Sequence, residues 1–414
     1  MRFPSPIRLI AVFMTVLMAQ SAFSQTPPPE RLSLQDAIRI AQSRNPLVRA
    51  GTARIAGADA RLNGAGALQN PSLTLAQPFG RNTGGLDEGT VLTETVELGD
   101  KRRQRVRASL GERDALRFDF TGTQTGLALS AQTAYFEALR ADVEKQLAEN
   151  VLSNAQAFTK VAQLQFQAGD VAQRDVIRSQ IELSRAEQTL TVAETERANR
   201  YANLRSLLLF PADTPLILTD SLTFSPDTYS LPTLLKTALE SRPDLQSARK
   251  IREAREAALH GARAQSQPDL LIEARRSTLD PTVGGNSLRV GVIFPIFDFG
   301  RIKSDTNSAK AALREQEATF EEATRVARLD VETSYRNLEQ ARKTVESFQK
   351  GRLDFSKRLL EMAQLGYANG ANTYLELLDA QQVYRTEQTD YARALTLYNT
   401  ARATLQRAVG GKLP

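Results

Sequence analysis

The segment YANGANTYLELLDAQ (residues 367–381) separates two long stretches that both have the composition of α-helix. Residues 296–413 contain no proline, and the same is true of residues 79–210. Because proline breaks helix interiors, two proline-free runs of this length predict very long helices. A short turn around Gly370 then reverses the chain, so that one long helix is followed by a second helix running back.

The pattern around this turn occurs twice. QAGDVAQRDVIRSQ (167–180) aligns with ANGANTYLELLDAQ (368–381), and at the same offset ELGDKRR (97–103) aligns with DFGRIKS (298–304). The alignment of so many turn-forming residues indicates an internal duplication, which is typical of pseudo-symmetric assembly. The first repeat is predicted over 25–220 and the second over 221–414.

Each repeat is predicted to begin with two helices that meet at an Asn-Pro or Arg-Pro step. Two segments follow in which apolar and polar residues alternate, and a period of two over about 8–10 residues predicts half-buried strands. Each long helix would then extend about 100 Å at 1.5 Å per residue. The strands are predicted near 71–78, 90–98, 268–277 and 287–296, and the long helices over 100–166 and 301–367.

Small and apolar residues recur along the helices at spacings of three and four. This spacing predicts a coiled-coil seam in which helix backbones approach closely. The fold class is therefore mainly α with a small β part. The seam positions are Ala131, Ala134, Ala138 and Ala141 on one helix, and Ala394, Tyr398, Ala401 and Leu405 on another.

The composition argues against several functional classes. The formal net charge of +6 is spread over many Arg and Glu residues, so no nucleic-acid partner is expected. The chain has no cysteine, which removes thiolate catalysis and cysteine–metal sites, and its one histidine, His260, is expected on a helix surface. We expect no enzymatic activity, no catalytic residues, no cofactor and no metal site.

The first residues have the pattern of a secretory signal. Arg2 and Arg8 precede an apolar run, and SAFSQ places Ala22 and Ser24 at the −3 and −1 positions of a cleavage site, which predicts a signal peptide over 1–24. No internal run approaches the roughly 20 apolar residues of a membrane helix. The four strands have the length of membrane-crossing strands, but four are too few to close a barrel. Three copies of the chain would together supply twelve strands.

Three motifs resemble those of the TolC-like outer-membrane efflux proteins: FPIFDFGRIKSD (294–305), VELGDKRRQRV (96–106) and YANGANTYLELLDAQQ (367–382). The resemblance covers essentially the whole mature chain. It implies a homotrimer whose 12-stranded barrel in the outer membrane continues into a tunnel of antiparallel coiled-coil helices through the periplasm. The implied function is the passive exit duct of a tripartite efflux pump. The implied partners are a periplasmic adaptor, an inner-membrane transporter and outer-membrane lipid.

The resemblance also assigns roles around the hairpin turns. Gly169, Asp175, Tyr367 and Gly370 would form the periplasmic tip, where the adaptor docks. Glu376 and Asp379 match two acids of the tip, and a trimer would gather six carboxylates into a constriction that prefers cations. The alternative is that both are ordinary solvated acids near a helix N-terminus. Asn372 stands where the family often has a basic residue, so one salt bridge of the closed tip is not carried over.

The cargo is open at this level. VELGDKRRQRV is similar to the Glu-Leu-Gly-Lys-Arg run of the heavy-metal-efflux branch, which favours divalent metals; drugs or a secreted polypeptide are the other options. The alternative functions are an outer-membrane component of type I protein secretion, and a periplasmic adaptor or structural coiled-coil protein outside the membrane. An adaptor would have one helical hairpin, whereas this sequence predicts two.

Overall fold

The computed structural model describes residues 30–76, 89–169, 171–276 and 285–413. The predicted signal peptide (1–24) lies outside these residues, as do the loop-side ends of the strands predicted near 71–78 and 268–277. No helix within the described ranges is both long enough and apolar enough to span a membrane.

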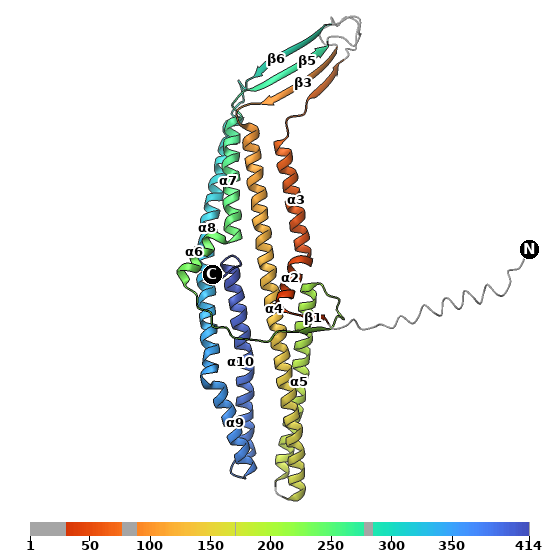
Figure 1. The fold of residues 1–414 in the computed structure, drawn as a ribbon, viewed down its shortest axis with the longest axis vertical. Helices are drawn as coiled ribbons and strands as arrows, with labels where there is room; N and C mark the ends of the chain where they lie inside the picture. Colours follow the sequence, from red (N-terminus) through yellow and green to blue (C-terminus); the bar gives the residue numbers. More distant parts are fainter. Residues whose placement is uncertain (1–29, 77–88, 170, 277–284, 414) are drawn as a thin grey trace, which may run out of the picture. The chain divides into compact units, whose positions relative to one another are not determined.

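The helices and strands follow the predicted order in each half (Figure 1). In the first half they are β1 (Glu30–Leu32), α2 (Leu34–Arg44), α3 (Pro46–Gly66), β2 (Ser72–Ala76), β3 (Gly89–Glu97), α4 (Lys101–Ala168), α5 (Gln173–Leu208) and β4 (Leu216–Leu218). In the second half they are α6 (Leu231–Ser241), α7 (Pro243–Ala264), β5 (Asp269–Arg276), β6 (Asn286–Ile293), α8 (Arg301–Ser347), the π-helical turn η1 (Phe348–Arg352), α9 (Leu353–Ala368) and α10 (Tyr374–Ala408).

The chain forms two compact units, and each takes segments from both halves of the sequence. Within the described residues, the first unit contains 30–41, 131–223 and 360–392, and therefore both hairpin turns. The second contains 42–130, 224–359 and 393–413, and therefore the four-stranded sheet with the helices that lead into and out of it. The two predicted repeats are consequently a description of sequence order, whereas each compact unit mixes the two halves.

The predicted seam is the core of the helical part. None of its eight residues exposes more than 8% of its surface. In the first unit, the small α4 residues let Tyr201 and Leu204 of α5 pack closely against that helix, together with residues of α2. Tyr135 of α4 is fully buried in the same cluster, and its hydroxyl donates to Asp220 at 2.8 Å. Burial, reinforced by the charge of Asp220, raises the pKa of Tyr135 to about 12.

The sheet has the order β2-β3-β5-β6, and all its neighbouring strands are antiparallel. Thr93 of β3 pairs with both Ser72 of β2 and Glu273 of β5, which fixes the register across the sheet. β6 ends at Ile293, three residues before the predicted end. The early end has a simple cause, since Pro295 has no N–H to donate to a neighbouring strand.

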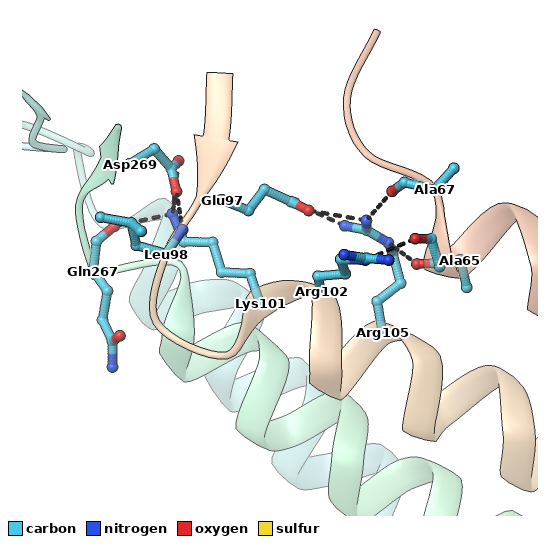
Figure 2. A network of polar contacts seen from close by, with 10 residues as sticks. Ala65, Ala67, Glu97, Leu98, Lys101, Arg102, Arg105, Gln267 and Asp269 are labelled. Atoms are coloured by element: carbon cyan, nitrogen blue, oxygen red, sulfur yellow. Dashed lines mark hydrogen bonds and ion pairs between the residues drawn. The ribbon is translucent and has the colours of Figure 1, made fainter. Parts of the chain in front are cut away.

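A polar network joins the sheet to the helices of the second unit (Figure 2). Lys101, at the start of α4, is almost fully buried, and its ammonium group donates to both carboxylate oxygens of Asp269 at 2.8 Å and to the Gln267 carbonyl at 2.9 Å. Gly99 turns the chain with φ +70°, and a Cβ there would lie 1.6 Å from the Gln267 Oε1 atom. Only glycine fits this turn.

Two arginines of the same motif close the end of α3. Arg105 forms a bidentate pair with Glu97 at 2.7 and 2.9 Å and also donates to the carbonyls of Ala65 and Ala67. Arg102 donates to the Gly66 carbonyl at 2.7 Å. The last carbonyls of a helix lack partners within it and attract cations, so both guanidinium groups cap α3, and that of Arg105 also holds Glu97 of β3 (Figure 2). The basic run after Gly99 therefore has a structural role at this junction.

The second long helix differs from its prediction. The sequence indicates one helix over 301–367, but the structure breaks it at η1, where Gly351 has φ +134°. The first repeat has no such break, because α4 is continuous over 68 residues. Gly351 adopts a backbone conformation that L-residues avoid, and a Cβ there would lie only 2.9 Å from the ring of Phe355, so glycine suits this position.

We expect Lys101→Met to destabilise the protein by about 1–3 kcal/mol, because it leaves Asp269 without the cation that is buried beside it. The measurement is the midpoint of thermal unfolding in detergent, followed by circular dichroism. Lys250→Met is the matched control, since it removes an exposed pair with Glu253 that contributes little. Equal midpoints for the two variants would contradict this account of the junction.

Candidate functional site at the hairpin turns

Both hairpin turns belong to the first unit and lie at the same end of it (Figure 1). At the second turn, Gly370 has φ +71°, and the N–H groups of Ala371 and Asn372 both donate to the Gly366 carbonyl, at 2.8 and 3.1 Å. At the first turn, Gly169 has φ +84° and donates to the Phe166 carbonyl at 3.1 Å. The left-handed conformation at both positions accounts for the paired glycines.

Glu376 has a defined structural task. Its carboxylate accepts a hydrogen bond from the Thr373 N–H at 2.7 Å, and the Glu376 N–H donates to the Thr373 hydroxyl at 3.3 Å. This reciprocal pair is a capping box, which satisfies two backbone donors at the start of α10. The Thr-x-x-Glu spacing of Thr373 and Glu376 is the sequence signal of this cap, which was not among the predictions. At the equivalent place in the first hairpin, Ala172 provides no side-chain cap.

Asp379 lies one turn further along α10. It is exposed, as Glu376 is, and it has neither a hydrogen bond nor an ion pair with any residue in the described part of the chain. The two acids therefore differ in environment: the backbone partly compensates the charge of Glu376, whereas the charge of Asp379 is left to solvent. Their role as a pore constriction stays a prediction.

An aromatic cluster links the two hairpins. The Tyr374 ring of α10 lies 6.2 Å from the ring of Phe158 on α4 and 5.9 Å from the ring of Tyr367 on α9. Burial raises the pKa of Tyr374 to about 12, with the Glu182 carboxylate adding to the effect. Burial also raises the pKa of Tyr367, and the charge of Asp175 raises it further. Two predicted tip residues, Tyr367 and Asp175, are thus brought together from different hairpins.

Apolar side chains continue this contact along the hairpins. Leu377 and Ala380 of α10 are buried against Ala363 of α9, and the cluster includes Phe158 of α4. Leu377 lies within the same Glu-Leu-Leu-Asp-Ala run as the two acids, so the run carries core residues as well as charged ones. Neither Phe158 nor Leu377 was predicted from the sequence to be part of the site.

A groove of about 930 Å³ runs beside this cluster and is lined by both hairpins. Its walls combine amides and charges of both signs with a similar share of apolar and aromatic side chains, so it suits a surface that offers hydrogen bonds as well as apolar contacts. Asp379 lies on its wall. The polar lining residues include Asn150, Asn154, Glu182, Arg185, Gln382 and Arg385.

The fold is that of the TolC-like outer-membrane channels. The CmeC outer membrane channel of Campylobacter jejuni superimposes with a TM-score of 0.75 and 18% identity, over 91% of this chain and 85% of that one. The sequence model of the outer membrane efflux protein family matches residues 37–208 and again residues 234–411. The chain therefore belongs to the outer membrane efflux protein family. The predicted resemblance, fold class and outer-membrane location are confirmed at this level.

Characterised relatives have different cargoes. The cobalt-zinc-cadmium resistance protein CzcC of Cupriavidus metallidurans is 23% identical over 92% of this chain and 90% of its own length. The pyoverdine export outer membrane protein OpmQ of Pseudomonas aeruginosa is 24% identical over 76% of this chain and 68% of its own length. CzcC agrees with the leaning toward heavy metals, but the similar identity of OpmQ means that identity alone does not select a cargo.

Proposed function

We propose that this chain is the passive outer-membrane duct of a tripartite efflux pump and that three copies enclose one channel. The observation that carries the proposal is the pair of sheet edges: among the described residues, β2 pairs only with β3 and β6 only with β5. Unpaired backbone groups are costly in lipid, and closure into a barrel removes them. Three four-stranded sheets give twelve antiparallel strands.

The two faces of the sheet support this assembly. One face is mainly apolar, with Glu94 inside it and Thr90, Arg276 and Asn286 at the loop end, whereas the other is mainly small, polar or charged and includes the ion pair between Glu273 and Arg289. Membrane barrels alternate in this way, with the apolar face toward lipid and the polar face toward a water-filled lumen. The apolar face comprises Leu73, Leu75, Leu92, Val96, Leu270, Ile272, Ala274, Leu288, Val290 and Val292.

The hairpin turns are the proposed entrance. Asp379 and Glu376 of three copies would supply six carboxylates, which attract cations and repel anions at a constriction. Asp175 and Tyr367 would help to hold the hairpins together there, and Gly169 and Gly370 would shape the turns. The periplasmic adaptor would dock on the outer side of the same turns, around Gly169 and Gly370.

Divalent metal cations are the proposed cargo. The likeness to CzcC along nearly the whole chain supports them, and the proposed acidic entrance would favour cations. A duct does not need to coordinate its cargo, so the scarcity of His, Met and Cys is compatible with metals. The energy and the choice of cargo would come from the inner-membrane transporter.

Closure by three copies can be tested by cross-linking, because the chain has no cysteine of its own. We expect Thr74→Cys on β2, combined in turn with Ser287→Cys, Arg289→Cys or Gly291→Cys on β6, to give a ladder that ends at three copies after oxidation. Opposed residues of antiparallel strands are close enough for a disulfide. Single-cysteine variants should remain monomers, because the strand opposite the cysteine then carries none. Monomers from every pairing, or ladders beyond three, would refute the closed trimer.

The entrance can be tested in planar bilayers with Glu376→Gln and Asp379→Asn combined. Glutamine can keep the capping box, so the change removes charge without fraying α10. We expect block by polyvalent cations to weaken by about tenfold or more, with Asp379→Asn alone giving most of the effect. Two controls should retain the block: Thr373→Ala, which weakens the cap, and the pair Glu187→Gln and Glu194→Gln on α5. Undiminished block in the double variant would place the constriction elsewhere.

The cargo can be tested in a strain from which this gene is deleted. We expect greater sensitivity to cobalt, zinc and cadmium salts, restored by the wild-type chain, and unchanged sensitivity to apolar drugs. Growth inhibition across a concentration series is the measurement. Sensitivity to drugs without sensitivity to metals would assign the duct to a different pump.

A further inference from the structure

One carboxylate interrupts the apolar face of the sheet. Glu94 of β3 pairs with Ile272 of β5 and lies between Leu92 and Val96 on the same face, because alternate residues of a strand share a face. The neighbouring residues on that face in β5 are also apolar. Glu94 is therefore an ionisable side chain within the surface that the proposed function turns toward lipid.

Nothing in the described part of the sheet compensates this charge. Glu94 has no hydrogen bond or ion pair with any described residue. The described cation on the same face is Arg276, which pairs with Thr90. Thr90 is four residues from Glu94 along β3, or about 14 Å at 3.4 Å per residue. An adjoining copy would bring β6, whose residues on this face, Leu288, Val290 and Val292, offer no cation.

The position of Glu94 puts it within reach of a membrane surface. It lies three residues from Glu97, the last residue of β3, so the separation is about 10 Å along the strand and about 8 Å along the membrane normal at the usual strand tilt. The same end of the sheet is followed by Phe294, Phe297 and Phe299, all exposed, with Phe299 at 99%. Exposed aromatic side chains are typical of the interface between lipid and water.

We propose that Glu94 binds the primary ammonium group of an ethanolamine phospholipid in the leaflet nearest the helices. A carboxylate that faces hydrocarbon is costly unless it is paired, and a charge-assisted N–H···O hydrogen bond to a headgroup supplies the pairing. A divalent metal is a poor alternative, because such ions take several oxygen ligands and this face has one carboxylate. The site rests on the proposed function, since it needs the apolar face to meet lipid.

The test is native mass spectrometry of the full mature protein with equimolar phosphatidylethanolamine and phosphatidylglycerol. We expect the wild-type chain to retain the ethanolamine lipid about fivefold or more over the glycerol lipid, and Glu94→Gln to lower this ratio to about one. Glu273→Gln is the matched control: Glu273 is one register position away on the polar face, and its loss should leave the ratio unchanged.

Equal retention of the two lipids by the wild-type chain, or an undiminished ratio in Glu94→Gln, would overturn the proposal. Conductance in planar bilayers separates this result from a failure of the proposed function. Pores without the lipid preference would refute the lipid site alone, whereas a wild-type chain that forms no pores would refute the duct and the lipid site together. Glu94→Gln should conduct as the wild type does, because the residue faces away from the lumen.

Discussion

The buried ion pair between Lys101 and Asp269 joins the first residue of α4 to the first residue of β5. It lies where an extended chain becomes helical, and that change would otherwise leave the backbone groups at the helix and strand ends without partners. Asp269 also accepts from the Leu98 N–H, while Arg102 and Arg105 take up the final carbonyls of α3. The sheet is thereby fixed to the helices of its own unit.

The two repeats reach the same topology by different local means. In the first, basic side chains after Gly99 make the junction; in the second, Asp298 accepts from the N–H groups of Gly300 and Ile302 at the start of α8. These hydrogen bonds hold the pKa of Asp298 below its usual range. The hairpins differ as well, because only the second has a capping box and a π-helical break. The two halves of the chain therefore share the order of their long helices and sheet strands, whereas their junctions and hairpins differ in detail.

The structural features that could be predicted from the sequence are those whose signals recur over many residues. Proline-free runs and small residues spaced by three and four predicted the long helices and their seam, since both signals accumulate over many residues. Alternation predicted the strands for the same reason. The break at Gly351 could not be predicted in this way: Gly111, Gly122 and Gly126 lie inside α4 without interrupting it. A single glycine permits a left-handed backbone, and tertiary packing determines whether it is used.

The same limit on prediction from the sequence applies to the candidate site at the hairpin turns. Gly169 and Gly370 could be identified because turns have a local signature, whereas the contact of Phe158 with Tyr374 joins residues that lie on different hairpins. Arg242 is a second example, since it reaches Asp330 of α8 and the Ala408 carbonyl at the end of α10. Such contacts depend on which helix faces pack together, and no pattern within one helix specifies that choice.

The structure also separates two acids that the sequence treats alike. Glu376 accepts a backbone hydrogen bond at the N-terminus of α10, where the helix dipole favours a negative charge. The backbone therefore compensates part of the charge of Glu376. Asp379 has no such partner in the described part of the chain, so no neighbouring group compensates its charge toward a nearby ion. If the entrance selects by charge, Asp379 therefore contributes more to the selection, and Glu376 contributes more to the stability of the helix that presents it.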